Sequence, residues 1–181
     1  KDSDEKRVYP EPEVVDEWLT KQRDLFSEEA WSVMYRFPLS KDNAEKFLSR
    51  IKSYVKLYGK VEVMHVVGQI AGQKLDVAIE SKDRKDLKVT LEFIDKYMSE
   101  DKEDTKAYFN LRFFEGIKDW LGYAKTAQNM IDKRGLKNHL SGVNNYSWTI
   151  YENATDENVL STAIGWMSNV VKLDPQYMYL D

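Results

Sequence analysis

The 181-residue sequence contains no cysteine, which excludes disulfide bonds, thiol chemistry and cysteine-ligated metal sites within the chain. This absence leaves the cellular compartment open. Long hydrophobic runs are also absent. The longest, at positions 61–70, is interrupted by Glu62, His65 and Gly68, so no membrane span is expected. Acidic and basic residues are interspersed at a net charge of −4 without a basic stripe, so nucleic acid is not an expected partner.

Two prolines and two glycines fall where helices are expected to end, at Pro38, Gly59, Gly135 and Pro175. Between these positions, apolar residues recur at helical spacing and the connections are short. Hydrophobic residues make up 42% of the chain, enough for a sizeable core. We predict an all-α fold, with antiparallel helical hairpins stacked as a tetratricopeptide-like solenoid or an irregular bundle.

One segment allows two interpretations. The run at 61–79 is rich in β-branched residues, which favour a strand, but the flanking helices leave such a strand no partner. We therefore expect a helix, in which Gly68 and Gly72 each cost about 1 kcal/mol relative to alanine and mark a close helix contact or a kink. Before this segment, Ser27 and Ser40 are suited to cap two helices, and the second of these is expected to continue to position 59.

The chain divides into three parts by composition and pattern. We expect a solvated tail at 1–12, an N-terminal helical region at 13–103 and tetratricopeptide-like hairpins at 104–181. The first of these hairpins is expected to begin at Asp104 or Thr105, with its partner helix starting at Ile117. Because the chain begins with a lysine, we expect a processed chain or a piece of a longer protein, and 177–181 has the pattern of a further helix start.

The stretch at 144–177 predicts the clearest hairpin. Its second helix has a small residue at Ala163, a bulky one four later at Met167, and a proline at Pro175, as a tetratricopeptide unit requires. The first helix matches that pattern only at Ile150, and Trp148 lies one place late. An ordinary pair of core helices remains the alternative.

Several tracts resemble a known family. The chain after about position 16 resembles the helical region that follows the thioredoxin domain in bacterial envelope proteins of the thiol–disulfide isomerase type. The resemblance rests on FSEEAWSVMYRF and FLSRIKSYVKLYG within 26–59, on Asp119-Trp120 and Tyr123-Ala124, and on NNYSWTIYEN and AIGWMSNVVKLDPQYMYLD within 144–181. It implies an accessory domain attached to a thioredoxin-like domain, in the periplasm or cell envelope, although the cytoplasm remains an alternative. The family's catalytic cysteine pair is absent, so no catalytic residue is implied.

Three residues are candidates for a protein-binding groove. With the 144–177 hairpin aligned to a tetratricopeptide unit, Asn145, Trp148 and Glu152 project from the first helix toward the concave face. Such grooves bind extended peptides or partner helices, and tryptophan is a favoured anchor. Two alternatives stay open: Trp148 is buried core, and Asn144 and Asn145 are capping residues.

Catalytic patterns are missing. His65 and His139 are the only histidines and lie far apart in sequence, so neither is expected to bind a metal or to act in catalysis. No Ser/His/Asp set, glycine-rich phosphate loop or metal-ligand spacing is found, so no cofactor and no metal are expected. Helix starts and polar helix faces account for the carboxylates.

These patterns favour a non-catalytic helical-repeat domain that mediates protein–protein interaction with a protein or peptide partner. The resemblance makes it the accessory C-terminal region of a thioredoxin-like protein. One alternative is a free-standing structural or peptide-binding helical protein. Another is a helical enzyme that uses carboxylate chemistry, which would require two facing carboxylates with raised pKa values.

Overall fold

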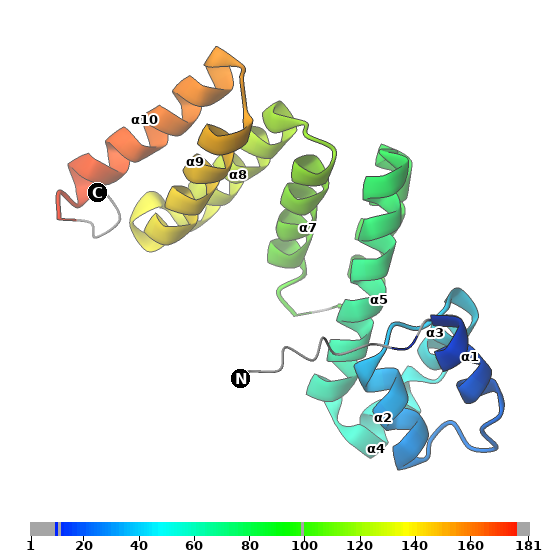
Figure 1. Cartoon of the computed structure of the whole chain (residues 1–181). Coiled ribbons are helices and arrows are strands. Elements are labelled where there is room, and N and C mark those ends of the chain that lie inside the picture. The colour runs from blue at the N-terminus through cyan, green and yellow to red at the C-terminus, as the bar shows by residue number, and fades with distance from the viewer. Residues whose placement is uncertain (1–9, 11, 99, 177–181) are drawn as a thin grey trace, which may run out of the picture.

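The computed structural model describes residues 10, 12–98 and 100–176, and these residues form an all-α structure without strands (Figure 1). In chain order its elements are α1 (Pro12–Thr20), α2 (Glu28–Arg36), α3 (Lys41–Ser49), α4 (Ile51–Tyr58), α5 (Lys60–Ser81), α6 (Arg84–Tyr97), α7 (Lys102–Gly116), α8 (Trp120–Arg134), the 3₁₀ helix η1 (Leu136–Asn138), α9 (Leu140–Asn153) and α10 (Glu157–Leu173). The all-α prediction is confirmed. Most of the predicted tail and the predicted helix start at 177–181 lie outside the described residues.

Helices α5 to α10 pack mainly against their neighbours in the sequence. The pairs α5–α6, α7–α8 and α9–α10 pack side by side, while α1 to α4 gather around the first part of α5 (Figure 1). The chain thus forms a row of helical hairpins that ends with α10, as expected of a solenoid or an irregular bundle.

Side-chain caps start several of these helices. The hydroxyl oxygen of Ser27 accepts a hydrogen bond from the Ala30 N–H at 3.2 Å, and that of Ser40 accepts one from the Asn43 N–H at 3.3 Å. Each cap stabilises its helix by about 1 kcal/mol because it satisfies an N–H that has no partner within the helix. Both predicted caps are confirmed.

The helix predicted to continue from Ser40 to position 59 is two helices. Arg50, between α3 and α4, has φ −118° and ψ 16°, outside the α-helical region. The apolar period continues across this break, since Phe47 before it and Tyr54 after it are each 1% exposed. Periodicity therefore did not reveal the break. The Tyr54 hydroxyl then donates to the Leu25 carbonyl oxygen at 3.0 Å, which ties α4 to the loop before α2.

The segment at 61–79 is helical, as predicted, and forms most of α5. Three of its β-branched residues, Val63, Val66 and Val67, are fully buried in the first core. A Cβ on Gly68 or Gly72 would meet nothing within 4 Å. Of the two expectations for these glycines, the close helix contact is therefore wrong, and the kink stays a prediction.

The bounds of α7 and α8 differ from the prediction. Helix α7 begins two residues before Asp104, after Asp101, which has a left-handed φ of 50°. Helix α8 begins three residues later than predicted, because Lys118 has a φ of 60° and turns the chain. Asp119 then caps α8, accepting a hydrogen bond from the Gly122 N–H at 2.9 Å. Single left-handed residues of this kind leave no periodic signal in the sequence.

Two hydrophobic cores share helix α7. The first core extends from α1 to α7 and includes Phe109 and Phe113. The second extends from α7 to α10 and includes Leu111. The predicted boundary between positions 103 and 104 falls inside this shared helix, and the division at that point remains a prediction.

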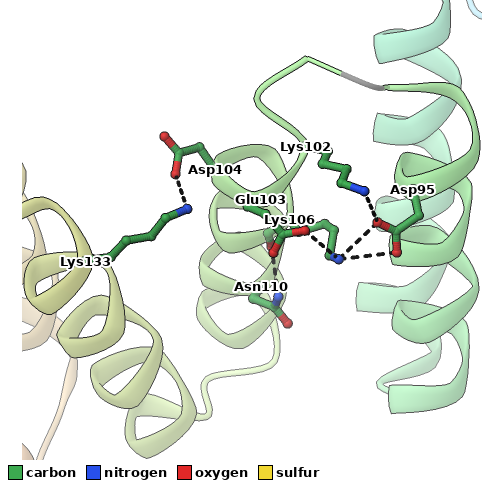
Figure 2. A network of polar contacts seen from close by, with 7 residues as sticks. All are labelled: Asp95, Lys102, Glu103, Asp104, Lys106, Asn110 and Lys133. Carbon is green, nitrogen blue, oxygen red and sulfur yellow. Dashed lines mark hydrogen bonds and ion pairs between the residues drawn. The ribbon is translucent and has the colours of Figure 1, made fainter.

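Ion pairs on the surface join α6, α7 and α8. The Lys106 ammonium lies 3.1 Å from an Asp95 carboxylate oxygen, and the Lys133 ammonium lies 3.2 Å from Asp104 (Figure 2). Hydrogen bonds from Arg134 and, to a smaller extent, from Lys133 lower the pKa of the Asp104 carboxyl. Because these side chains are partly exposed to solvent, the pairs are expected to stabilise the fold only weakly.

Candidate functional site

The hairpin of α9 and α10 is held in place by one of its two apolar faces. Val143 and Ile150 of α9, together with Trp166 of α10, are buried in the second core. The Trp166 indole N–H donates to the Gln128 side-chain oxygen of α8 at 2.6 Å. Asp156 caps α10, with its carboxylate accepting hydrogen bonds from two N–H groups of the first turn. The hairpin is thus a fixed support for whatever its second face presents.

That second face is a groove between α9 and α10 with a volume of about 640 Å³. It is mostly apolar and is open to solvent. Helix α9 lines it with Asn144, Ser147, Trp148 and Tyr151, and α10 lines it with Leu160, Ala163, Ile164, Met167, Ser168 and Val171. On each helix these positions recur at three- and four-residue spacing, so each helix lines the groove with one face. The positions on α10 form a second, mainly apolar stripe beside the buried one.

Large apolar side chains in this groove are exposed. Trp148 is 49% exposed, Tyr151 69% and Ile164 66%. The Trp148 and Tyr151 rings lie edge to face, with 5.4 Å between their centroids. Contiguous exposed apolar surface on a protein marks an interaction site more often than scattered single residues do. The interpretation of Trp148 as buried core is therefore wrong.

The hairpin is also poor in charge. Between positions 140 and 173 the charged residues are Glu152, Asp156, Glu157 and Lys172, whereas charged residues make up 32% of the whole chain. The exposed positions are occupied instead by serine, threonine, asparagine and large apolar residues. Depletion of charge together with exposed aromatic residues is typical of the centre of a protein–protein interface.

Two side chains of α9 bring polar groups to the groove. Asn144 is 8% exposed, but its amide is not a fully buried group without a partner, since Gln69 Oε1 is the only such side-chain atom among the described residues. Ser147 beside it is satisfied, because its hydroxyl donates to the Val143 carbonyl oxygen at 2.8 Å. The Asn144 amide therefore keeps contact with solvent in the open groove and is able to hydrogen-bond a polar group of a ligand.

The predicted site residues do not all lie in this groove. Trp148 lines it, while Asn145 and Glu152 are exposed on α9 outside its lining. Asn144 and Asn145 do not cap a helix, because α9 begins at Leu140 and both residues lie in its interior. The sequence prediction missed Tyr151, Ile164 and Met167. The stripe of apolar residues at 160, 163, 164, 167 and 171 was the signal that could have found them.

A second groove, of about 420 Å³, lies between α3, α5 and α6. Its lining includes the apolar residues Leu48 and Val77, but also the charged residues Lys74 and Asp86. The mixture of charges makes it a less distinct interface than the groove between α9 and α10.

His139 belongs to a polar chain at the start of α9. Arg134 Nη1 lies 3.4 Å from His139 Nδ1, and His139 Nε2 lies 2.9 Å from the Tyr146 hydroxyl. Because a guanidinium can only donate, Nδ1 acts as the acceptor and Nε2 carries the hydrogen. Burial is the largest cause that lowers the pKa of His139, and the positive charge of Arg134 lowers it further. The negative charge of Asp104 opposes this shift. These three side chains thus connect the end of α8 to the start of α9.

His65 contacts one residue of its own helix and one residue of α2. Its Nε2 lies 3.1 Å from the Gln69 side-chain nitrogen, and its ring lies 4.5 Å from that of Tyr35.

Among the described residues, no group of histidine, aspartate and glutamate side chains is arranged to hold a metal ion. The described helices include none that is both long and apolar enough to span a membrane. Comparison with protein-family models, curated proteins and solved structures found no match for this chain.

Proposed function

We propose that this chain is a non-catalytic helical module that binds a protein partner in the groove between α9 and α10. The observation that carries the proposal is the open apolar face of this hairpin, where Trp148, Tyr151 and Ile164 are about half or more exposed. Burying such side chains in an interface removes apolar surface from water, the main source of favourable free energy in association.

The lining favours a helical partner over an extended peptide. An extended peptide exposes a backbone N–H and C=O at every residue, and each needs a partner when it is buried. Few polar groups line the groove: the Asn144 amide, the Tyr151 hydroxyl and the hydroxyls of two serines. A helix satisfies its own backbone and offers an apolar stripe, with one polar side chain for Asn144.

The resemblance to envelope proteins of the thiol–disulfide isomerase type extends this proposal. The module would then position an attached thioredoxin-like domain against a protein partner. A peptide map of the native protein from its source cells tests this part: a Cys-x-x-Cys segment before the first residue is the expected result. If the native chain starts at Lys1, the link to a thioredoxin-like domain is rejected, and a free-standing helical binding protein is the better interpretation.

Photocrosslinking tests the groove itself. A photoreactive phenylalanine analogue would replace Ile164 in the groove or, as a control, Val61, which is 79% exposed and lines neither groove. We expect a protein adduct from position 164 in source cells and none from position 61, with the adduct identified by mass spectrometry. Equal labelling from the two positions, or no adduct from position 164, would contradict the proposal.

A further inference from the structure

We propose that the partner in the groove is the same hairpin of a second copy of this chain, so that two α9–α10 hairpins form a four-helix bundle around a twofold axis. This inference rests on the proposed function, since it uses the same groove and names its occupant. Each copy would offer the other an apolar face of two antiparallel helices, which is half of a bundle core.

The first argument is that the face suits itself. In a twofold interface the same surface meets itself, so a face with many charges of one sign would repel its copy. The groove residues are apolar or uncharged, and the charged residues of α10, Glu157 and Lys172, lie at its two ends, outside the groove lining. The face therefore lacks the repulsion that would keep two copies apart.

The second argument is the order of charges along the hairpin. Glu152 at the end of α9 and Glu157 at the start of α10 make one end acidic. The other end has Lys172 in the last turn of α10 and Lys137 in η1, which contacts α10, together with Asp174, whose carboxylate accepts a hydrogen bond from the Gln176 N–H. The hairpin thus has an acidic end and an end with two lysines.

This charge order selects one arrangement of the two copies. If the twofold axis crosses α10 at a right angle, the two α10 helices run antiparallel and Glu157 of each copy lies level with Lys172 of the other. If the axis runs along α10, the two acidic ends coincide instead. Glu157 and Lys172 form no ion pair within the described part of the chain, so both are free to pair between copies. Opposite charges at this level favour the antiparallel arrangement.

The third argument is the residue at the centre. The point midway between Glu157 and Lys172 lies between Ile164 and Gly165, where the axis would cross α10. Ile164 is the most exposed apolar residue of α10, and a Cβ on Gly165 would meet nothing within 4 Å. In the antiparallel pair, Ile164 of each copy would lie beside the axis, while Gly165, which does not line the groove, adds no side chain at this level. The centre of the interface would thereby be apolar.

A different account of the two charges needs no second copy. An acidic residue in the first turn and a basic residue in the last turn both complement the helix dipole. In that account, reversing either charge changes the stability of α10 and leaves association unaffected. The experiment below separates the two accounts.

Sedimentation equilibrium of the full chain is the first measurement. We expect a species of twice the chain mass of 21.3 kDa. Ile164→Asp is expected to be monomeric, while the control Val61→Asp stays dimeric, and circular dichroism checks that both variants remain helical. A monomeric parent chain, or a dimer that survives Ile164→Asp, would overturn the inference.

Charge reversal then tests the arrangement. Glu157→Lys and Lys172→Glu each turn two attractive pairs into two repulsive ones, and each is expected to raise the dimer Kd on the order of tenfold. An equimolar mixture of the two variants places opposite charges together at both ends, so dimers are expected to return as the mixed species. A mixture no more dimeric than its components would refute the antiparallel bundle.

The results also separate this inference from the proposed function. A monomeric chain whose photoreactive position 164 labels a different protein keeps the proposed function and rejects self-association. An adduct of two identical chains at position 164 supports both. No adduct at position 164 from a monomeric chain rejects both.

Discussion

At the scale of single residues, burial separates the side chains that support the fold from those that serve the groove. Trp166 and Trp148 belong to the same hairpin. Trp166 is 5% exposed and donates a hydrogen bond to the Gln128 side chain, while Trp148 is 49% exposed. Residue type alone does not distinguish them, and the sequence therefore left both interpretations of Trp148 open. Their difference in burial predicts opposite effects of substitution.

We predict that Trp148→Ala lowers the free energy of unfolding by about 1 kcal/mol, since only half of the side chain leaves a buried environment. Trp166→Ala is expected to cost about 3–5 kcal/mol, because it leaves a cavity. Urea denaturation measures both, in an Ile164→Asp background that keeps association out of the comparison. In the parent background, Trp148→Ala should weaken binding at the groove by about 2 kcal/mol or more. A large loss of stability from Trp148→Ala with binding intact would instead identify it as a structural residue.

His139 gives a second prediction, on pH. Its pKa is lowered from 6.5 in the folded chain, so below about pH 6.5 the unfolded chain takes up a proton that the folded chain resists. Stability contributed by neutral His139 is therefore present above pH 6.5 and is lost as the pH falls toward the folded pKa. Protonation would also put a hydrogen on Nδ1 facing Arg134.

The measurement is the urea midpoint between pH 7.5 and pH 5. We expect the midpoint to fall with pH in the parent chain and in His65→Asn, and the fall to be smaller in His139→Asn. An unchanged pH dependence in His139→Asn would mean that other groups cause it.

At the scale of elements, the presence of helices was predictable and their ends were not. Apolar residues at helical spacing predict the helices, and Ser27 and Ser40 predict two of the starts. The break at Arg50 and the turn at Lys118 were missed because each depends on the conformation of one residue with no special type. Most of the groove lining was missed for a related reason: two apolar stripes on α10 look like one broad face in the sequence, and only packing against α8 shows which stripe is buried.

One glycine controls how closely two helices approach. Gly116 ends α7, and a Cβ placed there would lie 2.6 Å from Cγ2 of Ile79 in α5. We predict that Gly116→Ala lowers the free energy of unfolding by about 1–3 kcal/mol through overpacking. In a double-mutant cycle, Ile79→Ala should relieve part of this loss. Gly68→Ala, at an open position, is the control and should stabilise the helix by up to about 1 kcal/mol.

The cap of α10 offers a prediction that bears on the groove. The Asp156 carboxylate accepts hydrogen bonds from the N–H groups of Asn158 at 2.9 Å and Val159 at 3.0 Å. Asp156→Ala is expected to cost about 1 kcal/mol, and Asp156→Asn much less, because asparagine keeps the acceptor. Thermal unfolding followed by circular dichroism compares the two. Equal losses in both variants would point to the charge rather than to the hydrogen bonds.

At the scale of the whole molecule, α7 is the part that the two cores share. Phe113 of α7 is fully buried in the first core, and Leu111 of the same helix is buried in the second. In a row of hairpins each unit is stabilised by its neighbours. A destabilising change in the shared helix should therefore lower the stability of the helices on both sides of it. Phe47, by contrast, is buried only in the first core, among α2 to α4.

Hydrogen exchange followed by mass spectrometry measures this coupling. We predict that Phe113→Ala, a change of about 3–5 kcal/mol, speeds amide exchange in both α5 and α10. Phe47→Ala is expected to speed exchange in α2 to α4 while α8 to α10 stay protected. Exchange in α10 that responds equally to both variants would show one cooperative unit. If it responds to neither, the hairpin that carries the groove is stable without α7, because its own core of Val143, Ile150 and Trp166 is then sufficient.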